Sequence, residues 1–364
     1  MENKAAKSDS KNRVVLVVLF FGTFFFLVFA DCYGGEKQKS VDTGKELLVA
    51  KDIYEARPIW CGQGVLIYTI RKNGVYWYNI ETGRKAKVAE PGSTPLACTP
   101  DGEWLVYIDK NSLRHDDGTI EREVIDVWRY EFKTERRQQF AIADYGEASS
   151  IGDGVLAPKG RRVFLGKQPK ARVKMPSPEW DIIWTQEKAG LTAWLHDSTA
   201  IVRVYSGEGK DRLFIRVFSP EKNIFLEQRA KYILRLLTDK QDNVYMQVSN
   251  EEFEPDLINE VIRCTVDLKE EKISCVPVLE DFSIKGFDVF PSGEAFVFME
   301  WRVEGCVKIA RVENSEASCI AKGLYHPGYY LSVSPDDKWL AFVVLSEKEG
   351  DVFTNDLYLI KLKN

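Results

Sequence analysis

Seven short β-hairpin signals constrain the fold of this chain more than any other feature, because they recur about every 46 residues. The clearest copies are Thr99-Pro100-Asp101-Gly102-Glu103-Trp104 and Ser334-Pro335-Asp336-Asp337-Lys338-Trp339. The turns lie near Gln63, Gly102, Gly160, Ser198, Gln241, Gly293 and Asp337. A regular period of this length, with turn residues followed by aromatic and β-branched runs, is typical of β-propeller blades. The sequence therefore predicts an all-β fold, a seven-bladed β-propeller, with six blades as the alternative.

The expected strands are apolar on both faces. Each turn is followed by an apolar run, such as VLIYTIR from Val65 and WLAFVVL from Trp339. Neighbouring blades cover both faces of a propeller blade, so runs without clean polar alternation are expected. The third blade is the exception, because residues 181–197 leave little room for a regular fourth strand. We expect that blade to be irregular.

The two ends of the repeat region complement each other. Residues 46–50 form a predicted strand without a blade of its own, and the last repeat stops at Asn364 after three strands. Adding residues 46–50 as the outer strand of the last blade completes that blade and removes an exposed edge. We therefore expect the propeller to occupy residues 46–364 and to be closed by its N-terminal strand.

An apolar segment precedes the repeats. Residues 14–30 read VVLVVLFFGTFFFLVFA and follow a net-positive arm that ends at Arg13. Residues 1–30 are thus either a retained membrane anchor or a signal peptide cleaved after Ala30. A third outcome is lipidation of Cys32, although Asp31 stands where lipoprotein signals carry Gly, Ala or Ser. Residues 31–45 are polar and Gly-rich, as in a flexible tether. Every outcome predicts a periplasmic or other extracytoplasmic body. Cleavage after Ala30 would release this body, whereas a retained segment 14–30 or lipidation of Cys32 would attach it to the membrane, and attachment is the outcome we expect.

Cysteine usage agrees with export. Apart from Cys32, the chain has six cysteines, an even set that an oxidising compartment allows to pair. Cys264 and Cys275 are the best candidate disulfide, because a turn at residues 268–272 places them directly opposite on two strands.

The other four cysteines are less clear. Cys61 and Cys98 occupy the same position in successive blades, so a bridge between inner strands is one interpretation. Cys306 and Cys319 are offset by two residues, a diagonal separation that strains a disulfide. The alternative is that all four are buried small apolar side chains.

The bulk composition is that of a folded protein, with 45% hydrophobic and 29% charged residues. The net charge of −5 would become more negative without residues 1–30, because that segment carries more cations than acids. A mildly acidic body is poorly suited to phosphate backbones, so nucleic acid is not an expected partner.

The turn-plus-strand units TPDGEWLVYIDK, FPSGEAFVFMEW and SPDDKWLAFVVLSE resemble the WD40-like (PD40) repeat of TolB-type propellers. The resemblance covers about residues 55–364, and its motifs are specific in three of the seven copies. It implies a ring used as a binding platform. TolB itself has a further α/β domain before its propeller, for which residues 33–45 leave no room, and the related peptidases carry a G-x-S-x-G elbow that this sequence lacks.

No residue set identifies a reaction. The three histidines, His115, His196 and His326, fall in separate loops and turns, and we interpret them as unrelated surface residues, although related pectate-fragment lyases hold a metal with several histidines. The sequence contains no Cys-x-x-Cys pair, phosphate loop or calcium loop. No cofactor is expected.

Long insertions between second and third strands should all emerge on one face, at residues 109–125, 167–178, 250–260 and 347–353. Loops on a rigid scaffold commonly carry recognition, and their uneven charge could orient a partner. The candidate binding residues are His115, Asp116, Asp117, Lys170, Arg172, Lys174, Glu252, Glu254 and Asp256. The alternative is a normally solvated rim.

The sequence thus favours an exported, membrane-tethered, non-enzymatic propeller that binds a protein or cell-envelope ligand. The alternatives are an exported lyase or hydrolase using a central pocket, and a structural envelope component.

Overall fold

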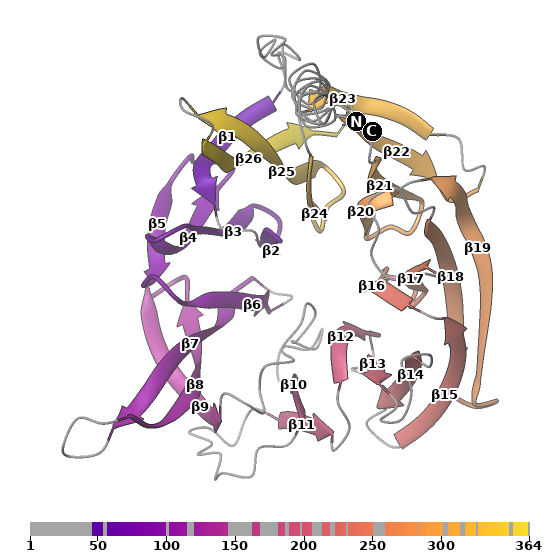
Figure 1. Cartoon of the computed structure of the whole chain (residues 1–364), viewed down its shortest axis with the longest axis horizontal. Helices are drawn as coiled ribbons and strands as arrows, with labels where there is room; N and C mark the ends of the chain where they lie inside the picture. The colour runs from indigo at the N-terminus through magenta and orange to yellow at the C-terminus, as the bar shows by residue number, and fades with distance from the viewer. Residues whose placement is uncertain are drawn as a thin grey trace, which may run out of the picture. The chain divides into compact units, whose positions relative to one another are not determined.

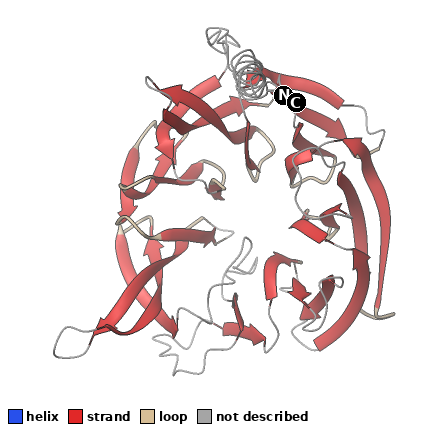
Figure 2. Cartoon of the chain, viewed as in Figure 1, coloured by secondary structure: helices blue, strands red, loops and turns tan. Residues whose placement is uncertain are grey.

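The structure is a computed structural model in which all regular elements of the described residues are strands (Figure 2). The described residues are 46–53, 57–99, 102–114, 120–144, 162–167, 181–185, 189–196, 199–205, 213–218, 223–230, 232–249, 259–282, 284–300, 305–313, 317–324, 327–348 and 352–362. All of these strands belong to the compact unit Thr43–Asn364. No helix in this part of the chain has the length and hydrophobicity needed to cross a membrane.

Four sheets are four-stranded antiparallel meanders in which sequential strands pair (Figure 1). The first comprises β6 (Thr94–Cys98), β7 (Trp104–Arg114), β8 (Ile120–Glu131) and β9 (Arg136–Asp144). The second comprises β12 (Ala189–Trp194), β13 (Ala200–Tyr205), β14 (Leu213–Phe218) and β15 (Asn223–Ala230). The third comprises β16 (Tyr232–Thr238), β17 (Val244–Ser249), β18 (Asn259–Asp267) and β19 (Lys272–Phe282). The fourth comprises β20 (Ile284–Val289), β21 (Ala295–Glu300), β22 (Gly305–Arg311) and β23 (Ala317–Leu324).

The largest sheet joins the two ends of the repeat region. Its order is β24 (Pro327–Val333), β25 (Trp339–Lys348), β26 (Val352–Lys361), β1 (Glu46–Ile53), β3 (Val65–Ile70), β4 (Gly74–Asn79) and β5 (Lys85–Ala89), with β2 (Ile59–Cys61) paired to β3. β1 runs antiparallel to β26, with Glu46 opposite Ile360, Leu48 opposite Tyr358 and Ala50 opposite Leu357. The N-terminal strand therefore occupies the outer position beside the last hairpin, where the sequence placed it.

The smallest sheet has only β10 (Arg162–Lys167) and β11 (Asp181–Thr185), which pair in parallel. Parallel neighbours need a crossover connection and cannot form a hairpin. This is where the sequence predicted an irregular blade. The turn expected near Gly160 lies outside the described residues.

Packing between neighbouring sheets forms the core. Tyr245 on β17 packs in one cluster with Phe287 on β20 and with Phe296 and Phe298 on β21, and all four are fully buried. Burying such side chains contributes about 1.5 to 3 kcal/mol each. Because both faces of a strand contribute, β17 and β21 are buried at every position, as their continuous apolar runs predicted.

One end of the sheets, here called the turn face, carries the short hairpins between first and second strands. These hairpins are linked from sheet to sheet: Lys240 donates through its backbone N–H to Pro291 O, and Ser292 donates likewise to Asp337 Oδ2. The Lys240 ammonium reaches Pro335 O at 3.0 Å. The opposite end, here called the loop face, carries the connections between second and third strands.

A second link ties the beginning of the described chain to its end. Arg57, just before β2, forms an ion pair with Asp288 on β20 at 2.5 Å and donates to Leu331 O on β24. Asp288 in turn accepts the backbone N–H of Val333 at 2.7 Å. Backbone groups of β24 are therefore bonded to the side chain of Arg57, from the segment before β2, and to that of Asp288, from the neighbouring sheet.

Deleting residues 46–50 removes four of the five β1 to β26 backbone pairs and leaves the edge of β26 open. We expect a fall in melting temperature of several degrees and a shift toward association, because exposed edges template pairing. Thermal unfolding and light scattering measure both. A matched deletion of residues 36–40, outside β1, is the control. Unchanged stability and monodispersity in the first deletion would contradict closure by β1.

Candidate binding face at the loop ends of the sheets

The candidate binding residues selected from the sequence all lie outside the described residues. They are His115, Asp116, Asp117, Lys170, Arg172, Lys174, Glu252, Glu254 and Asp256, and the same is true of the candidate lipidation site Cys32. The strands that lead into these loops are described, and they form the framework of this face.

The prediction of a loop at residues 109–125 is wrong over most of that range, because strands occupy it. β7 continues to Arg114 and β8 begins at Ile120, with pairs such as Asn111 opposite Val124. β9 accompanies β8 as far as the pair of Val124 with Asp144. The polar composition of the segment concealed these strands, which are held by backbone ladder bonds. The β7 and β8 strands therefore continue as a paired ribbon beyond the end of β6.

Two carboxyl groups face each other where this hairpin leaves the sheet. Asp109 on β7 lies directly opposite Asp126 on β8, and Asp126 is buried. Asp126 Oδ1 accepts Gln139 Nε2 at 2.9 Å. Asp109 Oδ1 is buried without a hydrogen-bond partner. Like charges directly opposite on adjacent strands destabilise a sheet, so this pair is unfavourable for folding alone.

The electrostatic surroundings of Asp109 follow from this geometry. Burial is the main cause that raises the pKa of its carboxyl, a hydrogen bond from Ser93 opposes the shift, and the neighbouring charge of Asp126 adds to it. A carboxyl of raised pKa beside a second carboxyl is a common arrangement at sites that bind cationic groups or exchange protons. The sequence had not singled out either residue, although an acid at the end of the apolar run WLVYID was the available signal.

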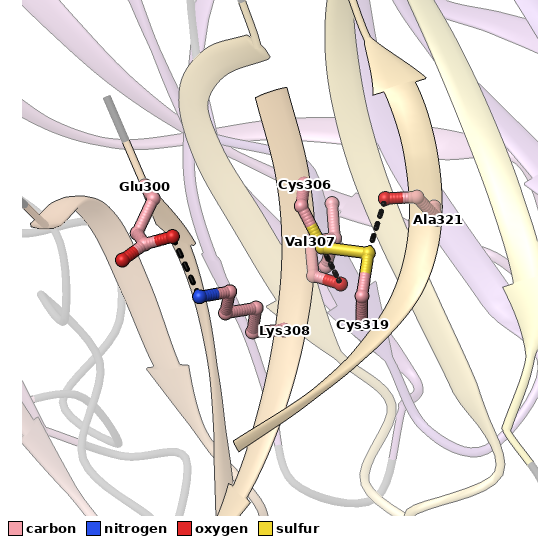
Figure 3. The surroundings of a disulfide bond; sticks show 6 residues. All are labelled: Glu300, Cys306, Val307, Lys308, Cys319 and Ala321. Carbon is pink, nitrogen blue, oxygen red and sulfur yellow. Dashed lines mark hydrogen bonds and ion pairs between the residues drawn. A yellow bond between two sulfur atoms is a disulfide. The ribbon is translucent and has the colours of Figure 1, made fainter. Parts of the chain in front are cut away.

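Acidic groups recur at the same level on two later sheets. Burial, followed by the charge of Glu280, raises the pKa of Glu260 at the start of β18. Glu300, at the end of β21, is buried and pairs with Lys308 Nζ at 2.6 Å. Figure 3 shows this ion pair between β21 and β22 together with the disulfide between β22 and β23 of the same sheet. The described framework of the loop face is thus lined with carboxylates on three sheets.

All six cysteines of the described chain are joined in pairs. Cys264 is bonded to Cys275, directly opposite in the ladder. Cys61 on β2 is bonded to Cys98 on β6, which links two neighbouring sheets. These disulfides stabilise a hairpin and a pair of neighbouring sheets, and the connections of the loop face begin on the same sheets.

The third disulfide joins Cys306 to Cys319 (Figure 3). From the sequence we expected these residues to be offset along the ladder by two positions, a separation that strains a disulfide. Register shifts in the β22 to β23 ladder leave Cys319 opposite Lys308, and the two cysteine Cα atoms lie 6.0 Å apart. That separation lies within the usual range for disulfides. The alternative interpretation, that Cys61, Cys98, Cys306 and Cys319 are free apolar side chains, is therefore wrong.

The turn face uses its polar groups differently. His196, the one histidine with a described position, has its Nδ1 2.9 Å from Asp242 Oδ1, and the same oxygen accepts its backbone N–H. Asp239 accepts the backbone N–H groups of Gln241 and Asn243 and the hydroxyl of Tyr245. These groups are satisfied within or between hairpins. Across the described ranges, no group of three or more His, Cys, Asp or Glu is placed to hold a metal ion.

Comparisons with known proteins bear on the fold. No family model matches the chain, and no curated protein matches it. An oligogalacturonate lyase structure from Vibrio parahaemolyticus matches with a TM-score of 0.56 and 11% identity over 88% of this chain and 95% of that chain. A prolyl endopeptidase structure matches with a TM-score of 0.49 and 14% identity over 87% of this chain and 47% of that chain. The WD40 repeats of RRP9 match with a TM-score of 0.49 and 9% identity, over 88% and 98%.

The chain has a β-propeller fold. The likeness at this identity is one of fold alone, and membership of the TolB-type family stays a prediction.

Replacing Asp109 with Asn tests the carboxyl pair. A carboxyl whose pKa is raised by folding favours the folded state only at low pH, and this contribution is lost as pH rises through the folded pKa. We therefore expect Asp109→Asn to raise the melting temperature at pH 7.5 and to give no gain at pH 4, as read from melting curves across that range.

Asp267 provides the control of opposite sign. Backbone N–H groups of Glu270 and Lys269 lower its pKa, so its contribution is present above the unfolded pKa and is lost as pH falls. Asp267→Asn should lower the melting temperature at neutral pH and have no effect in acid. Parallel behaviour of the two variants would contradict the assignment for Asp109.

Proposed function

We propose that this chain is an exported, membrane-tethered, seven-bladed β-propeller that binds a protein or cell-envelope ligand through its loop face and has no catalytic activity. The observation that carries the proposal is the carboxyl-lined framework of that face, above all Asp109 with its unpartnered buried oxygen opposite Asp126. A ligand with cationic groups would complement it. The basic residues at 170–174 provide the opposite charge elsewhere on the predicted loops.

Seven blades are supported by counting sheets. Four sheets contain four strands each, the largest contains two four-strand units, β2 to β5 and β24 to β26 with β1, and β10 with β11 supplies the seventh. These two units of the largest sheet are bridged by the single pair of Ile53 with Ile70. Each unit except the third contains a hairpin predicted from the sequence.

Export is supported by the three disulfides and by the apolar segment at residues 14–30. Disulfides persist in oxidising compartments and are rare in the cytosol. The membrane tether rests on the same segment, whose seventeen residues carry no charge.

A thiol-labelling experiment tests export. The full chain is produced in a bacterial host with a periplasm, and cells are treated with acid before alkylation of the denatured protein. We expect the six paired cysteines to be unreactive until a reductant is added, because the oxidising compartment keeps them bonded. The same chain without residues 1–30, held in the cytoplasm, should label at all six. Equal labelling of both forms would argue against export.

Site-specific photocrosslinking tests the binding face. Glu270 and Glu280 are exposed positions on one hairpin, at the turn face and the loop face respectively. A photoreactive residue at position 280 should give crosslinked adducts in envelope preparations, and the matched residue at position 270 should give few. Adding Asp109→Asn and Asp126→Asn should reduce the adducts at position 280. Adducts at 270 alone would place binding on the other face.

A further inference from the structure

β1 exposes an apolar pair that the fold does not use. The side chains of Leu47 and Leu48 are 45% and 39% exposed, and with Val276 they are the exposed large hydrophobic residues of the described chain. Adjacent residues of a strand point to opposite sides, so both sides of β1 present a leucine near its start. Isolated exposed leucines are common, but two together at one strand end call for an explanation.

Pairing of β1 with a further strand does not explain the two exposed leucines. From Glu46 to Lys51 the outer edge of β1 has no described ladder partner, since the contacts with β3 and its turn begin at Asp52 and Ile53. The ladder to β26 is shifted between Leu48 and Ala50 and again between Ala50 and Ile53. Bulged edges and an exposed lysine, here Lys51, are features that block regular pairing with a further strand.

The pair lies where the chain enters the sheet. Glu46 is opposite Ile360, which is opposite Leu340, so the start of β1 lies beside the hairpin of residues 334–338 at the turn face. Lys361 stands in the next row with its ammonium 5.9 Å from the Trp339 ring. An aromatic ring with a basic residue is a pairing that favours the lipid headgroup region.

The number of residues between this edge and the apolar segment sets an upper limit on their separation. Residues 31–45 span at most about 50 Å when fully extended. A polar, Gly-rich stretch of this length that acts as a tether, as the sequence predicts, has a root-mean-square length of about 20 Å. A weak apolar contact is sufficient under such tethering, because the effective concentration of lipid at the edge is high.

We infer that the start of β1, with Leu47, Leu48 and the Trp339 and Lys361 pair, rests on the lipid surface, so that the turn face is directed toward the membrane and the loop face away from it. The inference deepens the proposed function and rests on its membrane tether. It assigns different roles to the two faces: attachment to the turn face and ligand binding to the loop face.

Depth-dependent fluorescence quenching tests this orientation. The full chain is reconstituted into vesicles of phosphatidylethanolamine and phosphatidylglycerol that carry a headgroup nitroxide. A fluorescent amino acid replaces either Lys338, exposed at the turn face, or Arg71, exposed at the loop face of the same sheet. We expect quenching at position 338 to exceed that at position 71 by about twofold or more, because quenching requires proximity to lipid.

The variant Leu47→Ser with Leu48→Ser separates contact from tethering. It should bring the two quenching values together while vesicle retention and melting temperature stay unchanged. Equal or reversed quenching in the parent chain, with the chain retained on vesicles, would overturn the orientation and leave the tether intact. An unchanged ratio in the leucine variant would overturn the role of the pair. Failure of the parent chain to stay on vesicles would reject the tether itself, and the inference with it.

Discussion

The pairing of β1 with β26 is the constraint on which the remaining arrangement depends. It brings residues 46–53 beside residues 355–360, so the first and last parts of the described chain share one sheet. Loop closure over such a separation is entropically costly and must be offset by contacts made on closing. The buried cluster of Trp60, Leu66 and Tyr68 with Val343 and Leu357 supplies apolar area at this junction. Arg57, through Asp288 and Leu331 O, adds a polar link across the same junction.

Polar groups are distributed unequally between the two faces because their surroundings differ. At the turn face, tight hairpins bring backbone N–H groups close to Asp239 and Asp337, and each hairpin can bond to the next. At the loop face the strands continue or separate, and partial burial raises the pKa of Asp109 and of Glu260, as burial also raises that of Asp337 at the turn face. Burial thus acts on carboxyl groups at both faces, and the feature that distinguishes Asp109 is the second carboxyl, Asp126, directly opposite it in the ladder.

Those elements that depend on local chemistry were predictable from the sequence. Pro, Asp and Gly at hairpins fixed the turns near Gly102 and Asp337, and a short turn placed Cys264 opposite Cys275. Prediction failed where pairing depends on long-range or backbone effects. The β7 and β8 extension has too few apolar residues to show a period, the parallel pairing of β10 with β11 has no local signal, and the ion pair of Arg57 with Asp288 joins residues 231 positions apart.

The Asp109 and Asp126 pair shows why an unfavourable arrangement can point to function. An Asn at position 109 would fill the same space, keep the hydrogen-bonding capacity toward Ser93 and remove the opposed charges at neutral pH. Folding alone thus gives no reason for an acid there, whereas a cationic ligand at the loop face would turn the same carboxyl into a favourable contact. Proteins commonly retain such locally destabilising groups where a partner uses them. The opposed carboxyls at this hairpin are consequently the strongest physical support for the proposal that the loop face binds a ligand.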